Sequence, residues 1–154
     1  MTQHDAGKAL HIAFKSLGFS SGAIDYLLGI FHAISYFDDI KDGGAPEITT
    51  ETAVERILIL NSSSEFFWQH GRALEPIILT QALKWAAANY AEANGRASEK
   101  SFMWRAGFYD LALAVAYLDG VATIDNGAVL EQILCIYGEN LQDYFAEFDG
   151  GKNA

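Results

Sequence analysis

Apolar residues recur along this chain at the spacing of an α-helix. The segment 22–40 shows the period most clearly, because its large apolar side chains follow one another about three or four positions apart. These side chains are Ile24, Leu27, Leu28, Phe31, Ile34 and Phe37. Segments 5–17 and 49–60 carry the same period, and no long alternating run of β-branched residues indicates a strand. The pattern predicts an all-α fold.

Two segments, 77–90 and 108–118, are almost free of charged residues. A helix that is apolar on every side belongs in the interior of a domain, so we expect both segments to be among the most buried. A chain of 154 residues has the size of one domain and is long enough for a core, so we predict a single domain over residues 1–154. Its predicted architecture is a compact bundle of about seven helices.

Capping residues and helix breakers predict several helix ends. The candidate N-caps are Ser20 or Ser21, Thr49 or Thr50, and Ser98. Gly71 predicts the end of a short helix, and Pro76 suits the first turn of the next one. The final helix is expected over 128–148, with a bend at Gly138. In segment 49–60, we expect the apolar side chains to face inward, Val54 and Leu58 among them.

The densest group of acidic residues lies at the end of the apolar segment 22–40 and just after it. It consists of Asp38, Asp39, Asp42, Glu47 and Glu51. The glycines and the proline within 43–46 predict a loop, in which carboxylate and carbonyl oxygens can converge. Such oxygens are the ligands that Ca²⁺ and Mg²⁺ prefer. We predict a divalent-cation site here, and a solvated acidic turn after a helix is the other interpretation.

Two known acidic motifs do not account for this group. An EF-hand that started at Asp38 would place Ile40 and Thr49 where oxygen ligands are required. The chain also contains a DDxxD sequence, but a prenyl synthase needs a second acidic motif and a much longer chain. The serine-hydrolase elbow, the dinucleotide-binding glycine motif and the P-loop are all absent from the sequence. No catalytic residue is therefore predicted.

One short sequence pattern occurs twice in similar form. AISYFD at residues 33–38 is echoed by AVAYLD at residues 114–119, and ERIL at 55–58 parallels EQIL at 131–134. The echoes predict two helix–acidic loop–helix halves related by a pseudo-twofold axis. Chance similarity between helices rich in alanine and leucine is the alternative.

The chain contains a helix that ends A-x-A-x-x-D-G, followed by a short loop and a helix with an early Glu. This pattern resembles the tellurite-resistance TerB-like family. The resemblance covers residues 24–60 and 104–137, and its best match is AVAYLDGVATI. It implies an all-helical domain whose acidic cluster holds a divalent metal, and it adds Asp119 to the predicted ligands. Asn126 stands where the pattern has an acid, and Asp39 stands where it has a glycine.

Composition narrows the possible partners. Hydrophobic residues make up 51% of the chain and charged residues 19%, and twenty acids against ten bases give a net charge of −10. This negative net charge disfavours binding to nucleic acids and favours a cation or a basic protein as the partner. The high hydrophobicity predicts apolar surface that a second copy of the chain covers, and hence a homo-oligomer.

The single cysteine, the N-terminus and the lengths of the apolar runs bear on the core and on the location of the protein. Cys135 lies in the apolar run 133–136, and we expect it to be a small core residue. The N-terminus lacks the apolar region of a signal peptide, and no apolar run approaches the length of a membrane span. The sequence therefore predicts a cytoplasmic protein without membrane contact.

These observations favour a non-enzymatic, acidic binding or regulatory protein that binds a divalent cation or a protein partner. The first alternative is a small inhibitor or immunity-type protein that neutralises a basic protein target. The second is a helical metal-dependent phosphohydrolase, to which Glu92 and Asp110 would contribute carboxylates.

Overall fold

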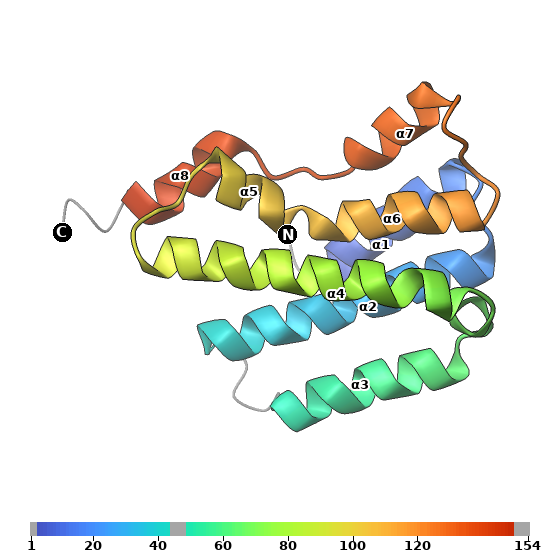
Figure 1. Cartoon of the computed structure of the whole chain (residues 1–154), viewed down its shortest axis with the longest axis horizontal. Helices are drawn as coiled ribbons and strands as arrows, with labels where there is room; N and C mark the ends of the chain where they lie inside the picture. The colour runs from blue at the N-terminus through green and yellow to red at the C-terminus, as the bar shows by residue number, and fades with distance from the viewer. Residues whose placement is uncertain (1–2, 44–48, 150–154) are drawn as a thin grey trace. The chain divides into compact units, whose positions relative to one another are not determined.

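The computed structural model describes residues 3–43 and 49–149, and this part of the chain contains helices and no strand. The predicted all-α fold, a bundle of about seven helices, is therefore confirmed. The helices are α1 (Gln3–Ser16), α2 (Ser21–Asp42), α3 (Thr50–Ser63), α4 (Glu65–Ala93), α5 (Glu99–Arg105), α6 (Gly107–Leu118), α7 (Gly127–Leu134) and α8 (Leu141–Asp149) (Figure 1).

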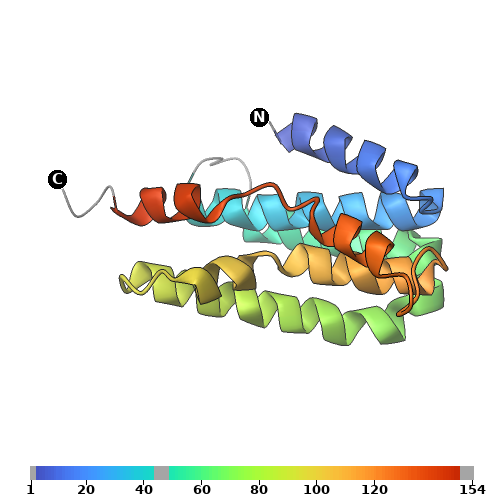
Figure 2. The same cartoon turned by 90° about the horizontal axis from the view of Figure 1, so that it is seen from above.

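The contacts of the chain divide it into two units, of which the first contains residues 1–71 and 115–125. This unit is built on α2: α3 runs beside it (Figure 1), and α1 lies along it (Figure 2). Its buried apolar side chains include Phe14, Phe19, Ile24, Tyr26, Leu27 and Ile30. A Cβ atom at Gly29 would lie 2.5 Å from Leu60 Cδ1, so the glycine allows α2 and α3 to approach closely.

The second unit contains residues 72–114 and 126–154, and α5 packs against α8 within it. Its buried apolar side chains include Leu74, Ala88, Leu111, Ile133 and Tyr144. Aromatic rings join the helices: the Phe102 ring lies 5.5 Å from that of Tyr137 and 5.4 Å from that of Tyr144, measured between centroids. Such separations are typical of packed aromatic pairs in protein cores.

Three predicted N-caps are confirmed, because each side-chain oxygen accepts a hydrogen bond from a backbone N–H in the first turn of its helix. They are Ser20 for α2, Thr49 for α3 and Ser98 for α5. Gly18 follows α1 with φ of 90°, a conformation that glycine adopts without strain.

Helix α4 contradicts the prediction of a break near Gly71. The helix runs for 29 residues through both Gly71 and Pro76. Gly71 is buried, and a Cβ atom there would lie 3.2 Å from the Phe67 ring, so this glycine serves close packing instead of ending a helix. Pro76 removes one backbone hydrogen bond, and the remaining bonds of a long helix outweigh that loss.

The predicted final helix over 128–148 is divided into α7 and α8, and Gly138 lies between them. The side chain of Asn140 accepts a hydrogen bond from the backbone N–H of Asp143 at 2.8 Å. This local bond is typical of a helix N-cap, so a new helix starts there and the previous one does not continue.

The burial prediction is confirmed for one apolar segment and wrong for the other. Within 108–118, the buried residues are Phe108, Leu111, Ala112, Val115 and Ala116. Within 77–90, only Ala88 is buried, whereas Leu79, Leu83 and Tyr90 are 60%, 62% and 65% exposed. The scarcity of charged residues in 77–90 therefore did not predict whether this part of α4 is buried.

Two smaller predictions about the core are also wrong. Cys135 is exposed, because α7 ends at Leu134 and the cysteine forms its C-cap. Val54 and Leu58 are also exposed, since α3 turns the small side chain of Ala53 toward the core instead. Among the described helices, none is both long enough and apolar enough to cross a membrane.

Candidate functional site

The acidic residues that were expected in a loop lie on the last turns of α2. Asp38 and Asp39 are half-buried, and Asp42 is exposed. The helix ends only at Gly43, whose φ of 67° is that of a regular left-handed C-cap. The predicted loop at these three acids is therefore wrong, because the helix continues to the first glycine. Glu47 lies outside the described residues.

Glu51, which belonged to the same predicted group, stands in the first turn of α3. Its backbone N–H and the side chain of Thr49 donate hydrogen bonds that lower the pKa of the carboxyl. An anionic side chain at this position suits the positive end of the helix dipole. The surroundings of Glu51 are therefore those of a helix-start residue.

Asp119 has a structural partner. Its Oδ2 accepts a hydrogen bond from the backbone N–H of Ser20 at 2.7 Å, and its Oδ1 accepts one from the Ser20 hydroxyl at 2.6 Å. Ser20 is the N-cap of α2, so the carboxylate lies at the positive end of that helix. Within the first unit, these two hydrogen bonds thus hold the segment after α6 against the start of α2.

Among the described residues, no three His, Cys, Asp or Glu side chains form a group that could hold a metal ion. The cation site predicted from Asp38, Asp39, Asp42, Glu47 and Asp119 includes one residue outside the described part of the chain. It stays a prediction.

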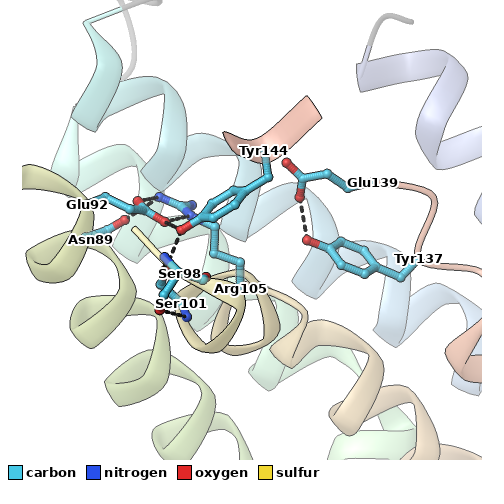
Figure 3. A network of polar contacts seen from close by, with 8 residues as sticks. All are labelled: Asn89, Glu92, Ser98, Ser101, Arg105, Tyr137, Glu139 and Tyr144. Atoms are coloured by element: carbon cyan, nitrogen blue, oxygen red, sulfur yellow. Dashed lines mark hydrogen bonds and ion pairs between the residues drawn. The ribbon is translucent and has the colours of Figure 1, made fainter. Parts of the chain in front are cut away.

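The densest polar cluster lies in the second unit and centres on Glu92, which is only 8% exposed (Figure 3). Arg105 Nε donates to Glu92 Oε1 at 2.6 Å, and Arg105 Nη2 donates to the other oxygen of the same carboxylate. Nη2 also donates to Asn89 Oδ1 at 2.8 Å. The Tyr144 hydroxyl donates to Glu92 Oε1 at 2.8 Å and lies 2.6 Å from Ser101 Oγ.

This cluster fastens α8 to α4 and α5. Both oxygens of Glu92 accept hydrogen bonds, as a buried carboxylate requires. Asp110, the other carboxylate of the phosphohydrolase interpretation, accepts a hydrogen bond from Lys84 Nζ at 2.7 Å. Each acid is thus engaged by a basic side chain of its own unit, which favours a structural role.

Tyrosines around the cluster have raised pKa values. Burial raises the pKa of Tyr109. Burial also raises that of Tyr137, and the Glu139 carboxylate, which accepts its hydroxyl hydrogen bond, adds to the effect (Figure 3). For Tyr144, burial is again the largest cause, and Glu92 contributes. These hydroxyls remain protonated at neutral pH, and those of Tyr137 and Tyr144 donate hydrogen bonds to Glu139 and Glu92.

The opposite face of α4 is apolar and exposed. We call its six residues the α4 stripe: Leu79, Ala82, Leu83, Ala86, Ala87 and Tyr90. All six are exposed, and their spacing of about three or four residues places them on one side of the helix. No charged residue lies among them on this side.

Polar residues of α4 occupy the other side. Lys84 binds Asp110, Asn89 and Glu92 bind Arg105, and the buried oxygen of Gln81 lies close to α6. Between residues 79 and 92, the helix therefore turns Lys84, Asn89 and Glu92 toward the second unit, together with the buried Ala88, and leaves the α4 stripe exposed.

Opposite charges lie at the two ends of the α4 stripe. Glu75 is exposed and stands one turn before Leu79. At the other end, the guanidinium carbon of Arg96 lies 5.3 Å from the centre of the Tyr90 ring. The apolar stripe is thus bounded by an acid at its N-terminal end and by a base at its C-terminal end.

Sequence reasoning missed this surface because it used only the scarcity of charge in 77–90. The signal was the phase of the polar residues: Gln81, Lys84, Asn89 and Glu92 recur at helical spacing, which assigns them to one face. That phase separates a polar side from an apolar side. It does not say which of the two faces the core.

Comparisons with known protein families, with curated proteins and with solved structures find no match for this chain. The resemblance to the TerB-like family therefore stays a prediction.

Proposed function

We propose that the protein is a non-enzymatic binding protein and that the α4 stripe is its contact surface for a partner protein. The observation that carries the proposal is the orientation of α4. Its polar side chains Lys84, Asn89 and Glu92 are engaged within the second unit, and the apolar stripe is left exposed to water.

Burial of this surface would be favourable. Moving an exposed leucine side chain fully out of water is worth roughly 1.5–3 kcal/mol, and the stripe contains two leucines and a tyrosine. Single exposed apolar residues are common and require no explanation, but a continuous apolar helix face is typical of a protein-binding site.

Helix α3 provides a weaker candidate for the same role. Val54, Leu58 and Ile59 are exposed on it. However, Glu55 and Arg56 lie next to them in the sequence and are exposed as well. The α4 stripe is longer and contains no charge, which favours α4 as the centre of a contact.

A basic protein target is the second candidate, and the net charge of −10 favours it. Acidic residues would then form the rim of the contact and steer the target by long-range attraction. Binding to such a target weakens strongly with salt, because ions screen charges that are separated by more than about 8–10 Å. Binding through the α4 stripe is much less sensitive to salt.

Photo-crosslinking in cells tests the proposal. A photoreactive residue at position 83 of the full chain should form discrete adducts with a specific protein, either another copy or a different one. The matched control is position 12 on α1, where Ile12 is 60% exposed but belongs to no comparable stripe. The substitution Leu79→Glu should abolish the adducts from position 83. Equal labelling from both positions, or no discrete adduct from position 83, would overturn the proposal.

A further inference from the structure

We propose that the partner of the α4 stripe is a second copy of this chain, docked so that the two α4 helices run antiparallel about a twofold axis. This inference rests on the proposed function and names its partner. The axis passes the middle of the stripe, between Leu83 and Ala86. In such an interface the same patch serves both copies, so the patch must complement itself.

The side-chain sizes along the stripe are self-complementary. Large residues stand toward its ends and alanines fill most of its middle. The large side chains protrude from the helix, and the alanines leave recessed positions between them. With the axis between Leu83 and Ala86, each Leu83 faces Ala86 of the second copy, and each Leu79 faces the second copy's Tyr90. Large side chains thus meet small ones near the axis, where two helices approach most closely.

The charges at the ends of the stripe select the antiparallel orientation. Glu75 precedes the stripe, and Arg96 follows it with its guanidinium against the exposed Tyr90 ring. Antiparallel docking brings Glu75 of each copy toward Arg96 of the other, which gives two opposite-charge contacts. Parallel docking would bring Glu75 toward Glu75 and Arg96 toward Arg96, which is unfavourable. Arg72 lies about a turn farther out than Glu75, and the Arg96 guanidinium stays on the Glu75 side because it folds back against the Tyr90 ring, which faces Leu79 of the other copy.

Sedimentation velocity of the full chain tests the proposal. The wild-type protein should form a dimer at tens of micromolar, and Leu83→Glu should weaken dimerisation at least tenfold, because it places a charge at the centre of the contact. Ile12→Glu is the matched control and should leave the dimer unchanged. Circular dichroism verifies that each variant retains its helices.

A charge exchange tests the orientation. Glu75→Arg alone and Arg96→Glu alone should each weaken the dimer several-fold, because each creates two like-charge contacts. The double variant should recover most of the lost affinity. A wild-type monomer, or a dimer that a folded Leu83→Glu variant keeps, would overturn this inference. If the wild type is a monomer but position 83 still crosslinks to another protein, the inference fails and the proposed function stands. If neither contact is found, both fail.

Discussion

At the scale of single residues, the paired hydrogen bonds of Asp119 give the clearest link between sequence and stability. The carboxylate accepts both the backbone N–H and the hydroxyl of Ser20. Asp119→Ala should therefore lower the free energy of unfolding by about 1 kcal/mol, a typical cost for the loss of a helix-cap interaction. Urea unfolding in the presence of EDTA measures the change.

Asp125→Ala is the matched control, because Asp125 is exposed in the same unit and near the same turn. Its effect should stay within about 0.5 kcal/mol. If Asp119→Ala destabilises the protein only when a divalent cation is present, the carboxylate acts as a metal ligand and the structural account of it is incorrect.

The tyrosine hydroxyls of the second unit predict how stability depends on pH. Burial raises the pKa of Tyr109 and of Tyr144 above the ordinary value of 10.0, so the folded state holds these protons more tightly than the unfolded state. The stabilisation is complete below pH 10 and is lost as the pH rises beyond it. Unfolding by urea at several alkaline pH values should show this decline.

Tyr144→Phe should remove part of this pH dependence and cost about 1–3 kcal/mol at neutral pH, since it deletes a hydrogen bond to the Glu92 carboxylate. Tyr90→Phe is a suitable control, because Tyr90 is 65% exposed. An unchanged alkaline profile for Tyr144→Phe would show that this hydroxyl is not the responsible group.

Some of these residues were predictable from the sequence. Ser20, Thr49 and Ser98 were identified as caps because capping depends on a few neighbouring residues. The partnership of Glu92 with Arg105 and Tyr144 was not predictable, since it joins three helices and α8 is distant in sequence from the other two. The same limit applies to the bonds between Asp119 and Ser20.

At the scale of helices, α2 shows how a local signal was misinterpreted. The glycines and the proline within 43–46 suggested a loop that included the three acids, but α2 continues to Asp42. Acidic residues at the end of α2 lower the stability of the helix, because a carboxylate near a helix C-terminus faces the negative end of the helix dipole.

Asp42→Asn should therefore stabilise the protein by about 0.3–1 kcal/mol at low ionic strength. Asp25→Asn is the control, because Asp25 is exposed on the same helix and lies far from its C-terminus. Thermal unfolding with and without millimolar Ca²⁺ or Mg²⁺ measures both effects. If either cation raises the melting temperature of the wild type but not of Asp42→Asn, the acidic end of α2 binds metal.

Helix α4 shows a different limit of prediction. Its helical character followed from the sequence, whereas its length and orientation did not. Gly71 and Pro76 are ordinarily helix breakers, and tertiary packing overrides them here. Amphipathic phase identifies two faces, but the partners Asp110 and Arg105, which draw the polar face inward, lie on other helices.

At the scale of the whole molecule, the composition and the α4 stripe point to the same conclusion. A chain that is 51% hydrophobic and 19% charged was predicted to leave apolar surface for a second copy. The α4 stripe is the location that we propose for that contact. The sequence could not locate it, because exposure depends on which side of each helix the other helices cover.

Crosslinking near the proposed twofold axis tests this account most directly. Ala86→Cys is introduced together with Cys135→Ser, which removes the single native cysteine. Ala73→Cys in the same background is the control, since Ala73 is an exposed alanine toward the N-terminal end of the same helix. In the proposed dimer, two copies of residue 86 would be offset by about 5 Å along the helix axes, whereas two copies of residue 73 would be offset by about 35 Å.

A short bis-maleimide should therefore convert the Ala86→Cys protein to a covalent dimer and leave the Ala73→Cys protein monomeric. Efficient crosslinking at residue 73, or none at residue 86 under conditions where the protein sediments as a dimer, would contradict the antiparallel contact of the α4 stripes.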